Sequence, residues 1–324
     1  MASSAHLTFD VATAVALGQR EAQEDAIVAD FPIGGGLGLV VLADGMGGHN
    51  AGDIASKIVV TEVFSELKLR GVELMRDPSS VSETLRKAAF AANSCLASHT
   101  EMHPRTTGMG ATLVGLVQLQ DALFWISIGD SLLYLLRDGK LTKLNQDHSL
   151  APQIDYMVRQ GLLTEEAGRN HPDRNCLTSA LRGEDIPFID CPDAPIQLQP
   201  NDIVLSGSDG LHFLDPDEIA EIVMDQAGPS ADIAAALLRQ IDVLGHPDQD
   251  NVCLSIVQVG AAASAAAMPL AHNGAAQGRA AQASAVQAST VQAHASASMR
   301  ASGATGAALG LMNKIRSFRL GALR

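Results

Sequence analysis

Three aspartates of this chain stand beside runs of apolar residues. Asp44 and Asp209 each follow such a run and precede a glycine, and Asp250 comes just before another run. A carboxylate left without a partner at the edge of a sheet is costly, whereas several together supply the hard oxygen ligands of Mg²⁺ and Mn²⁺. Taken singly, each of these aspartates is more typical of an ordinary turn than of a ligand. If the three converge in the fold, they predict a site for divalent cations.

Short strands and amphipathic helices must position these aspartates. Apolar runs bounded by Gly, Asp, Asn or Pro predict strands over residues 11–17, 37–43, 112–119, 123–128, 132–136, 202–206 and 252–259. Several runs are separated by only a few residues, which favours antiparallel pairing. Helical periodicity predicts helices over residues 51–67, 81–96 and 233–244. Strands and helices without strict alternation indicate an α+β sandwich.

Further short motifs occur in a fixed order along the chain. They are Arg-x-x-x-Glu-Asp (20–25), Asp-Gly-Met-Gly-Gly-His (44–49), Gly-Met-Gly-Ala-Thr (108–112), Gly-Asp-Ser (129–131), Ser-Asp-Gly (208–210) and Asp-Asn (250–251). With these motifs, residues 8–259 resemble the type 2C metal-dependent serine/threonine protein phosphatases (the PPM family), especially their stand-alone bacterial members. The resemblance implies a four-layer α-β-β-α sandwich, in which helices flank two central antiparallel β-sheets and two metal ions lie in a channel at one edge.

The resemblance also implies a ligand set. Asp44 would bridge two Mn²⁺ or Mg²⁺ ions, and the backbone carbonyl of Gly45 would bind one of them. Asp209 and Asp250 would complete the protein ligands of the other ion. So few protein ligands suit Mg²⁺ and Mn²⁺, because these ions keep several waters in octahedral oxygen sites.

Three further residues take roles from the same resemblance. Glu24 and Asp25 would be outer-shell groups that hold metal-bound waters, and Arg20 would grip the substrate phosphate in a bidentate geometry. A water shared by two cations has a lowered pKa, so a bridging hydroxide could attack phosphoserine or phosphothreonine directly, without a covalent phospho-enzyme. Without the resemblance, a surface ion pair with Glu24 at helical spacing is the preferred explanation of Arg20.

The general acid is the first departure from the family pattern. Many eukaryotic relatives carry a His directly after the Asp-Gly pair, where this chain has Met46, which cannot donate a proton. His49 and a metal-bound water are the two candidate acids. A role in capping the following helix, or in packing beside it, is expected for His49 ahead of catalysis.

A third metal is the second departure. Relatives hold it with the Asp of Gly-Asp-Ser, here Asp130, and with an Asp at the position where this chain has Phe213. Asp215 is better placed to cap a helix that begins near Pro216. We therefore expect two well-held ions and at most a loose third.

Charge and cysteine spacing limit the classes of partner. The chain of 324 residues has a net charge of −14, and residues 1–260 alone carry 36 acidic and 16 basic residues, or −20. Such a body disfavours nucleic acid. The four cysteines show no zinc-like spacing, and the sequence has neither a signal-peptide pattern nor a membrane-spanning run. These features indicate a cytoplasmic protein, whose partners under the resemblance are phosphorylated proteins and an opposing serine/threonine kinase.

The chain is expected to have three parts. Residues 1–260 form the phosphatase domain, residues 261–310 form an Ala/Ser/Gln-rich disordered linker, and residues 311–324 form a candidate basic amphipathic helix. That helix would dock on a membrane periphery or an acidic partner, and a frayed, solvated terminus is the equal alternative. Within the domain, the segment 145–190 takes the place of the mobile flap of the family and would select substrates. Its candidate phosphopeptide contacts are Arg159, Arg169 and Arg174.

A catalytically weak or inactive adaptor that binds phosphoproteins with the same fold is the alternative function. A decayed site is expected to lose its metal ligands first, so the presence of Arg20, Asp44, Asp209 and Asp250 argues for the enzyme.

Overall fold

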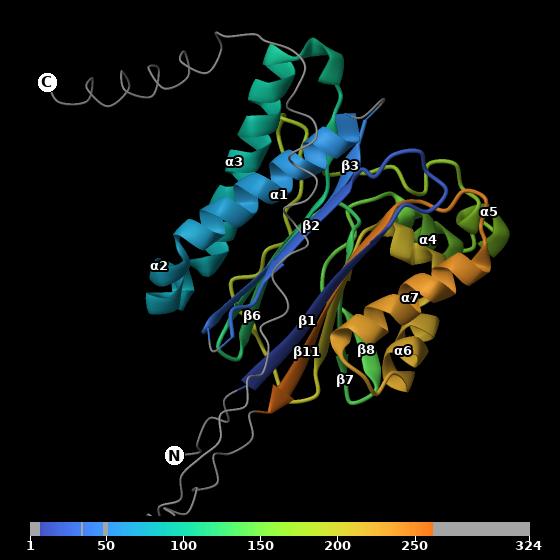
Figure 1. The fold of residues 1–324 in the computed structure, drawn as a ribbon. Helices are drawn as coiled ribbons and strands as arrows, with labels where there is room; N and C mark the ends of the chain where they lie inside the picture. Colours follow the sequence, from blue (N-terminus) through green and yellow to red (C-terminus); the bar gives the residue numbers. More distant parts are fainter. Residues whose placement is uncertain (1–6, 34, 48–50, 262–324) are drawn as a thin grey trace, which may run out of the picture. The chain divides into compact units, whose positions relative to one another are not determined.

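Two antiparallel sheets form the centre of the protein (Figure 1). The computed structural model describes residues 7–33, 35–47 and 51–261. One sheet has the strand order β1 (Leu7–Ala16), β11 (Val252–Ala261), β10 (Ile203–Gly207), β7 (Leu132–Arg137) and β8 (Lys140–Lys143). The other has the order β2 (Asp25–Asp30), β3 (Leu37–Met46), β5 (Leu113–Leu119), β6 (Ala122–Ile128) and β9 (Ile196–Gln197), and the short β4 (Gly110–Ala111) pairs with the end of β3.

Helices cover the outer face of each sheet (Figure 1). The β2–β9 sheet packs against α1 (Ala51–Leu69) and α3 (Val81–Met102), which are joined by the short α2 (Gly71–Arg76). The β1–β8 sheet packs against α6 (Pro216–Asp225) and α7 (Ser230–Leu244). Between β8 and β9 the chain forms α4 (Ala151–Arg159) and α5 (Glu165–Arg169), and 3₁₀ turns span Pro78–Ser80, Pro104–Thr106 and Asp209–Phe213.

Three buried apolar clusters show that the layers are stacked as helix, sheet, sheet and helix. In β3, Val40 and Leu42 face the cluster between the two sheets, whereas Leu39 and Val41 face the helices α1 and α3. Both faces of β3 are therefore buried, which explains why its sequence is a continuous apolar run instead of an alternating one. The four-layer α-β-β-α sandwich expected from the resemblance is confirmed.

The seven predicted strands and three predicted helices are all present, with ends displaced by a few residues. The strands β2, β4, β8 and β9 were not predicted. The helix α6 begins at Pro216 as expected, and Asp215 caps it in a capping box with Glu218, whose carboxylate accepts a hydrogen bond from the Asp215 backbone N–H at 2.9 Å. Asp215 therefore serves the helix end.

The C-terminal expectations concern residues that are not described. Apart from Ala261, the predicted linker (261–310) and the candidate amphipathic helix (311–324) lie outside the described residues. Among the helices of the described ranges, none has the length and apolar character needed to cross a membrane.

Candidate active site

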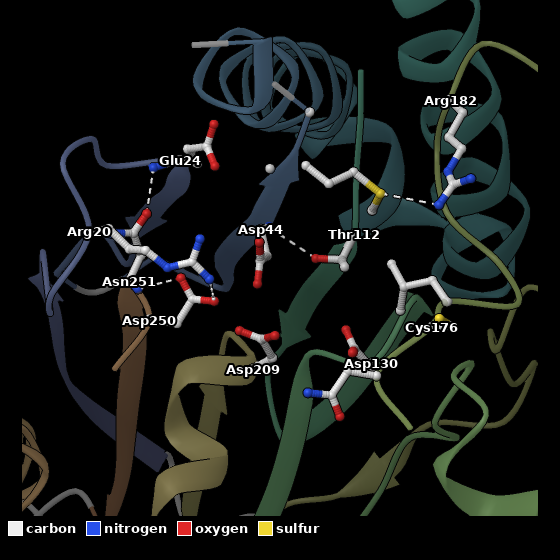
Figure 2. A pocket seen from close by; sticks show the side chains of 15 residues that line it. Arg20, Glu24, Asp44, Thr112, Asp130, Cys176, Arg182, Asp209, Asp250 and Asn251 are labelled. Carbon is white, nitrogen blue, oxygen red and sulfur yellow. Dashed lines mark hydrogen bonds and ion pairs between the residues drawn. The ribbon is translucent and has the colours of Figure 1, made fainter. Parts of the chain in front are cut away.

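The ends of strands from both sheets meet at one edge and bring the predicted site residues together. Because β1 and β11 run antiparallel, the chain leaves β1 toward Arg20 at the edge where Asp250 leads into β11. A cavity of about 420 Å³ opens at this edge (Figure 2). Its lining includes seven of the predicted residues, namely Arg20, Glu24, Asp44, Gly45, Asp130, Asp209 and Asp250.

Two buried carboxyl groups flank this cavity with raised pKa values. Asp25, the first residue of β2, is 6% exposed and accepts a hydrogen bond from Ser208 Oγ at 2.7 Å. Burial, together with the negative charges of Asp209 and Asp250, raises the pKa of Asp25 to about 7. Burial and the charge of Asp209 also raise the pKa of Asp130 to about 7. Protons or cations must offset this concentration of acid.

The carboxyl groups of Asp44 and Asp209, at the centre of the site, also have raised pKa values. Burial and the neighbouring charge of Asp209 hold the pKa of Asp44 well above its ordinary value, and burial and Asp250 raise the pKa of Asp209. Asp209 Oδ1 is inaccessible to solvent and has no hydrogen-bond partner among the described residues. A buried acceptor without a partner, next to further carboxylates, fits divalent cations with oxygen ligands.

Arg20 forms an ion pair within the site. Its Nη2 lies 2.5 Å from Asp250 Oδ2, and the other oxygen of Asp250 accepts the backbone N–H of Asn251 at 2.7 Å (Figure 2). Among the described residues Arg20 forms no ion pair with Glu24, the partner that helical spacing suggested. Nor do three side chains of His, Cys, Asp or Glu in those residues already stand in a metal-ligating arrangement. A cation bound by Asp250 would therefore share its carboxylate with Arg20 or displace the Arg20 contact.

Backbone contacts fix the end of β3, which carries Gly45. The Gly45 N–H donates to the carbonyl of Glu24 at 3.1 Å, and a Cβ at Gly45 would lie 2.1 Å from the carbonyl oxygen of Gly52. Only glycine fits there. The Glu24 N–H in turn donates to Asn251 Oδ1 at 2.8 Å, so the residue after Asp250 also ties Glu24 to the site.

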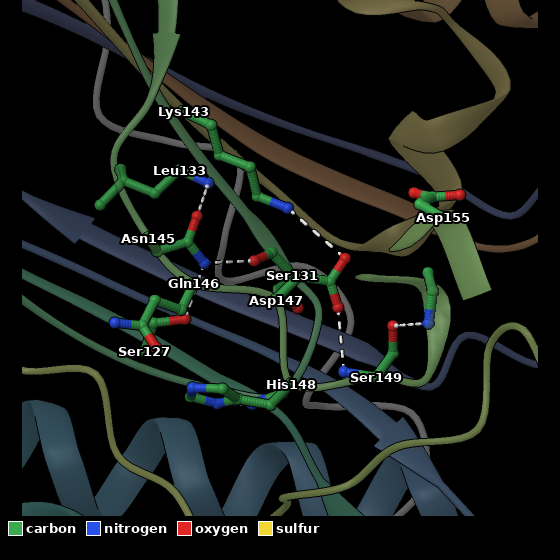
Figure 3. Close-up of polar contacts among 12 residues, drawn as sticks. Ser127, Ser131, Leu133, Lys143, Asn145, Gln146, Asp147, His148, Ser149 and Asp155 are labelled. Carbon is green, nitrogen blue, oxygen red and sulfur yellow. Dashed lines mark hydrogen bonds and ion pairs between the residues drawn. The ribbon is translucent and has the colours of Figure 1, made fainter. Parts of the chain in front are cut away.

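A buried hydrogen-bond network extends from Asp44 into the sandwich. The Asp44 N–H donates to Thr112 Oγ1 at 2.9 Å, and that hydroxyl lies 2.8 Å from Ser131 Oγ. Asn145 Nδ2 donates to the Ser131 carbonyl at 2.8 Å, and Asn145 Oδ1 accepts the Leu133 N–H at 2.9 Å (Figure 3). The start of the segment 145–190 is thereby connected to the strand end that carries Asp44.

Of the residues at which the chain departs from the family pattern, one lines the cavity and one lies away from it. Met46 lines the cavity, as expected for the residue after Asp-Gly. Phe213 is not part of the cavity lining, and its ring packs on His246 with 5.1 Å between the centroids. His49, the candidate general acid, lies outside the described residues.

The sequence did not identify the residues that the segment 145–190 contributes to the cavity. They are Asn175, Cys176, Leu177 and Arg182. The candidate contacts Arg159, Arg169 and Arg174 do not line the cavity, and Arg174 pairs with Asp155 at 2.6 Å. No sequence pattern indicates which side of this irregular segment faces the site, because contacts with distant residues determine it.

Comparisons with known proteins agree with this geometry. The sequence model of the family described as Protein phosphatase 2C matches residues 17–164. A putative protein phosphatase 2C-type of Streptococcus pyogenes is 33% identical over 245 residues, which cover 74% of this chain and 94% of that protein. The serine/threonine protein phosphatase PstP of Mycobacterium tuberculosis is 31% identical over 245 residues. These residues cover 74% of this chain and 43% of that longer protein.

A solved phosphatase structure is also similar to this chain in its fold. The crystal structure of the catalytic domain of PstP in complex with two manganese ions is 30% identical to this chain. It superposes with a TM-score of 0.61, covering 78% of this chain and 99% of that one.

Proposed function

Since the chain belongs to the protein phosphatase 2C family, we propose that it is a metal-dependent protein serine/threonine phosphatase. It hydrolyses phosphoserine and phosphothreonine in proteins by direct transfer of the phosphoryl group to water. The convergence of five carboxylates in one cavity, with Asp209 Oδ1 buried and unpartnered among the described residues, is the observation that carries the proposal. The names of the relatives, which are serine/threonine phosphatases, support the same activity.

The proposed cofactors are two Mn²⁺ or Mg²⁺ ions, with a third ion doubtful because Phe213 has no ligand atom. Asp44, the carbonyl of Gly45, Asp209 and Asp250 would hold the two ions. The catalytic domain of PstP, which was crystallised in complex with two manganese ions, supports this number. When bound, such ions supply a nucleophilic water of lowered pKa and positive charge opposite the phosphoryl oxygens.

The other residues of the site orient and hold these groups. Glu24 and Asp25 are proposed as outer-shell acceptors for water, and the Ser208 hydroxyl keeps Asp25 in place. Arg20 is proposed to leave its Asp250 contact and grip the phosphate with two parallel N–H donors. Met46 lines the cavity but cannot protonate the leaving alkoxide, so this proton would come from His49 or from water.

The test is release of phosphate from a phosphoserine peptide with Mn²⁺ and with chelator. We expect turnover only with Mn²⁺, and a loss of about 100-fold or more in Asp209→Asn, because that change removes one charge and one strong ligand. Asp217→Asn is the matched control, since Asp217 is exposed on α6. Equal rates for wild type and Asp209→Asn would refute the enzyme. Tight phosphopeptide binding without turnover would instead support the adaptor alternative.

The remaining proposals concern the context of the enzyme. We propose a cytoplasmic phosphatase that works in signal transduction against a serine/threonine kinase. Residues 1–260 would form its catalytic domain, residues 261–310 its linker and residues 311–324 a basic segment for peripheral membrane or acidic-partner contact.

A further inference from the structure

Arg182 presents a second guanidinium group to the cavity. Two arginines of the described residues, Arg20 and Arg182, line the cavity, and Figure 2 shows them on opposite sides of Asp44. Arg20 is paired with Asp250, whereas no carboxylate lies within 4.0 Å of Arg182 in the described part of the chain. The Arg182 side chain is exposed. Of these two arginines, Arg182 is therefore the one whose guanidinium group is available to a ligand from solvent.

The backbone of Arg182 is held firmly. The N–H groups of Arg182 and Gly183 both donate to Asn93 Oδ1 on α3, at 3.0 and 2.8 Å. The preceding Leu181 exchanges two hydrogen bonds of 2.9 Å with Ala111 on β4. Contacts from two separate elements thus fix the point at which the side chain of Arg182 leaves the backbone.

The side chain of Arg182 is also directed toward the site. A Cβ at Gly110 would lie 2.8 Å from Arg182 Cγ, so the absence of a side chain at Gly110 leaves the room that the Arg182 stem occupies. Arg182 Nη2 lies 3.3 Å from Met46 Sδ, two residues after Asp44. Sulfur is a weak acceptor, and in the described structure it is the one protein acceptor of the five guanidinium N–H donors. The group is held in place, and its donors remain available for an oxyanion.

We propose that Arg182 is a specificity-determining residue that binds an anionic group on a residue flanking the phosphorylated one in the substrate. This inference rests on the proposed phosphatase function. The ligand chemistry is a carboxylate or a second phosphate, because a guanidinium binds either in a bidentate geometry. Away from the two proposed cations the body is strongly acidic, so an anion that flanks the phosphorylated residue is favoured where a cation such as Arg182 faces it.

The experiment compares matched phosphoserine peptides that carry Glu, Gln or a second phosphoserine at the flanking positions. Steady-state kcat/KM is measured with Mn²⁺ for wild type, Arg182→Gln and Arg182→Lys. We expect wild type to prefer the Glu or the phosphoserine peptide over the Gln peptide by about two- to fivefold, the upper part of the range of a solvent-exposed ion pair. In Arg182→Gln this preference disappears, and Arg182→Lys restores part of it.

Two further measurements separate this role from others. Arg239→Gln, which removes an equal charge from the exposed face of α7, should keep the wild-type preference. Binding of peptides with a nonhydrolysable phosphonate in place of the phosphate should show the same dependence on Arg182 as kcat/KM does.

Three outcomes would overturn the inference. They are a wild type that does not distinguish the peptides, an equal fall for all peptides in Arg182→Gln, and a preference that survives the substitution. Absence of turnover of every peptide by wild type would instead refute the proposed function. A preference confined to the second phosphate or to Glu identifies which anion Arg182 binds.

Discussion

Replacing Thr112 by valine tests whether the buried network positions Asp44. Thr112 is 2% exposed, and its hydroxyl accepts the Asp44 N–H and contacts Ser131 Oγ. Valine keeps the shape but leaves both polar groups without this partner. A buried polar group that loses its partner costs about 1–3 kcal/mol, so we expect Thr112→Val to lower the free energy of unfolding by about 2–4 kcal/mol.

Activity should fall together with stability. A displaced Asp44 would misplace the groups that it orients, and a shift of about 1 Å in a reacting geometry costs on the order of 100-fold in rate. We expect kcat for a phosphopeptide to drop by about 10- to 100-fold in Thr112→Val. Urea denaturation gives the stability, and kinetics at a temperature where the variant is folded give the rate.

Thr112→Ser is the matched control, because it retains the hydroxyl and removes one methyl group. Loss of one buried methyl costs about 1 kcal/mol, so Thr112→Ser should be somewhat less stable but close to wild type in kcat. Greater damage from serine than from valine would show that packing of the methyl group, and not the hydrogen bond, holds the site. A fully active and stable valine variant would refute the positioning role altogether.

Further predictions concern the ion pairs, titration and tail of the chain. Arg137→Met should destabilise the fold by about 3 kcal/mol in urea, because Asp202 is 1% exposed and loses its two-pronged partner; an unchanged midpoint would contradict this. Burial lowers the pKa of His148 below its ordinary value, so the contribution of this residue to stability should decrease as pH falls through about 6.5, where the unfolded chain takes up the proton first. His148→Asn should therefore lose less stability between pH 7.5 and pH 5 than wild type, and an equal loss would refute the assignment. The 324-residue chain should sediment with anionic vesicles and a chain ending at Gly260 should not, whereas equal sedimentation would dismiss the proposed membrane contact of the C-terminal segment.

Local sequence patterns were sufficient for the elements that carry the site. The apolar run before Asp44 and the one after Asp250 predicted β3 and β11, because each is buried on both faces and bounded by turn residues. The edge strand β2 was not predicted, because it is short, only partly buried along most of its length and has an aspartate at each end. The motif order then indicated the family, and with it the stacking of the sheets.

Long-range side-chain contacts could not be predicted from the sequence. Arg20 pairs with Asp250, 230 positions away, and Arg182 is held by Asn93, 89 positions away. No periodicity connects such residues, since only the packed fold brings them together. For the same reason the sequence did not indicate that Arg182 lines the cavity, because charge alone does not tell which arginine of the segment 145–190 faces it.

Calorimetric titration with Mn²⁺ tests the central claim most directly, since it does not depend on turnover. If the carboxylates around Asp44 and Asp209 form a two-cation site, wild type and Asp217→Asn should each bind two Mn²⁺ ions per chain, and Asp209→Asn should lose at least one of them. Absence of saturable Mn²⁺ binding by wild type, or unchanged binding by Asp209→Asn, would contradict the account.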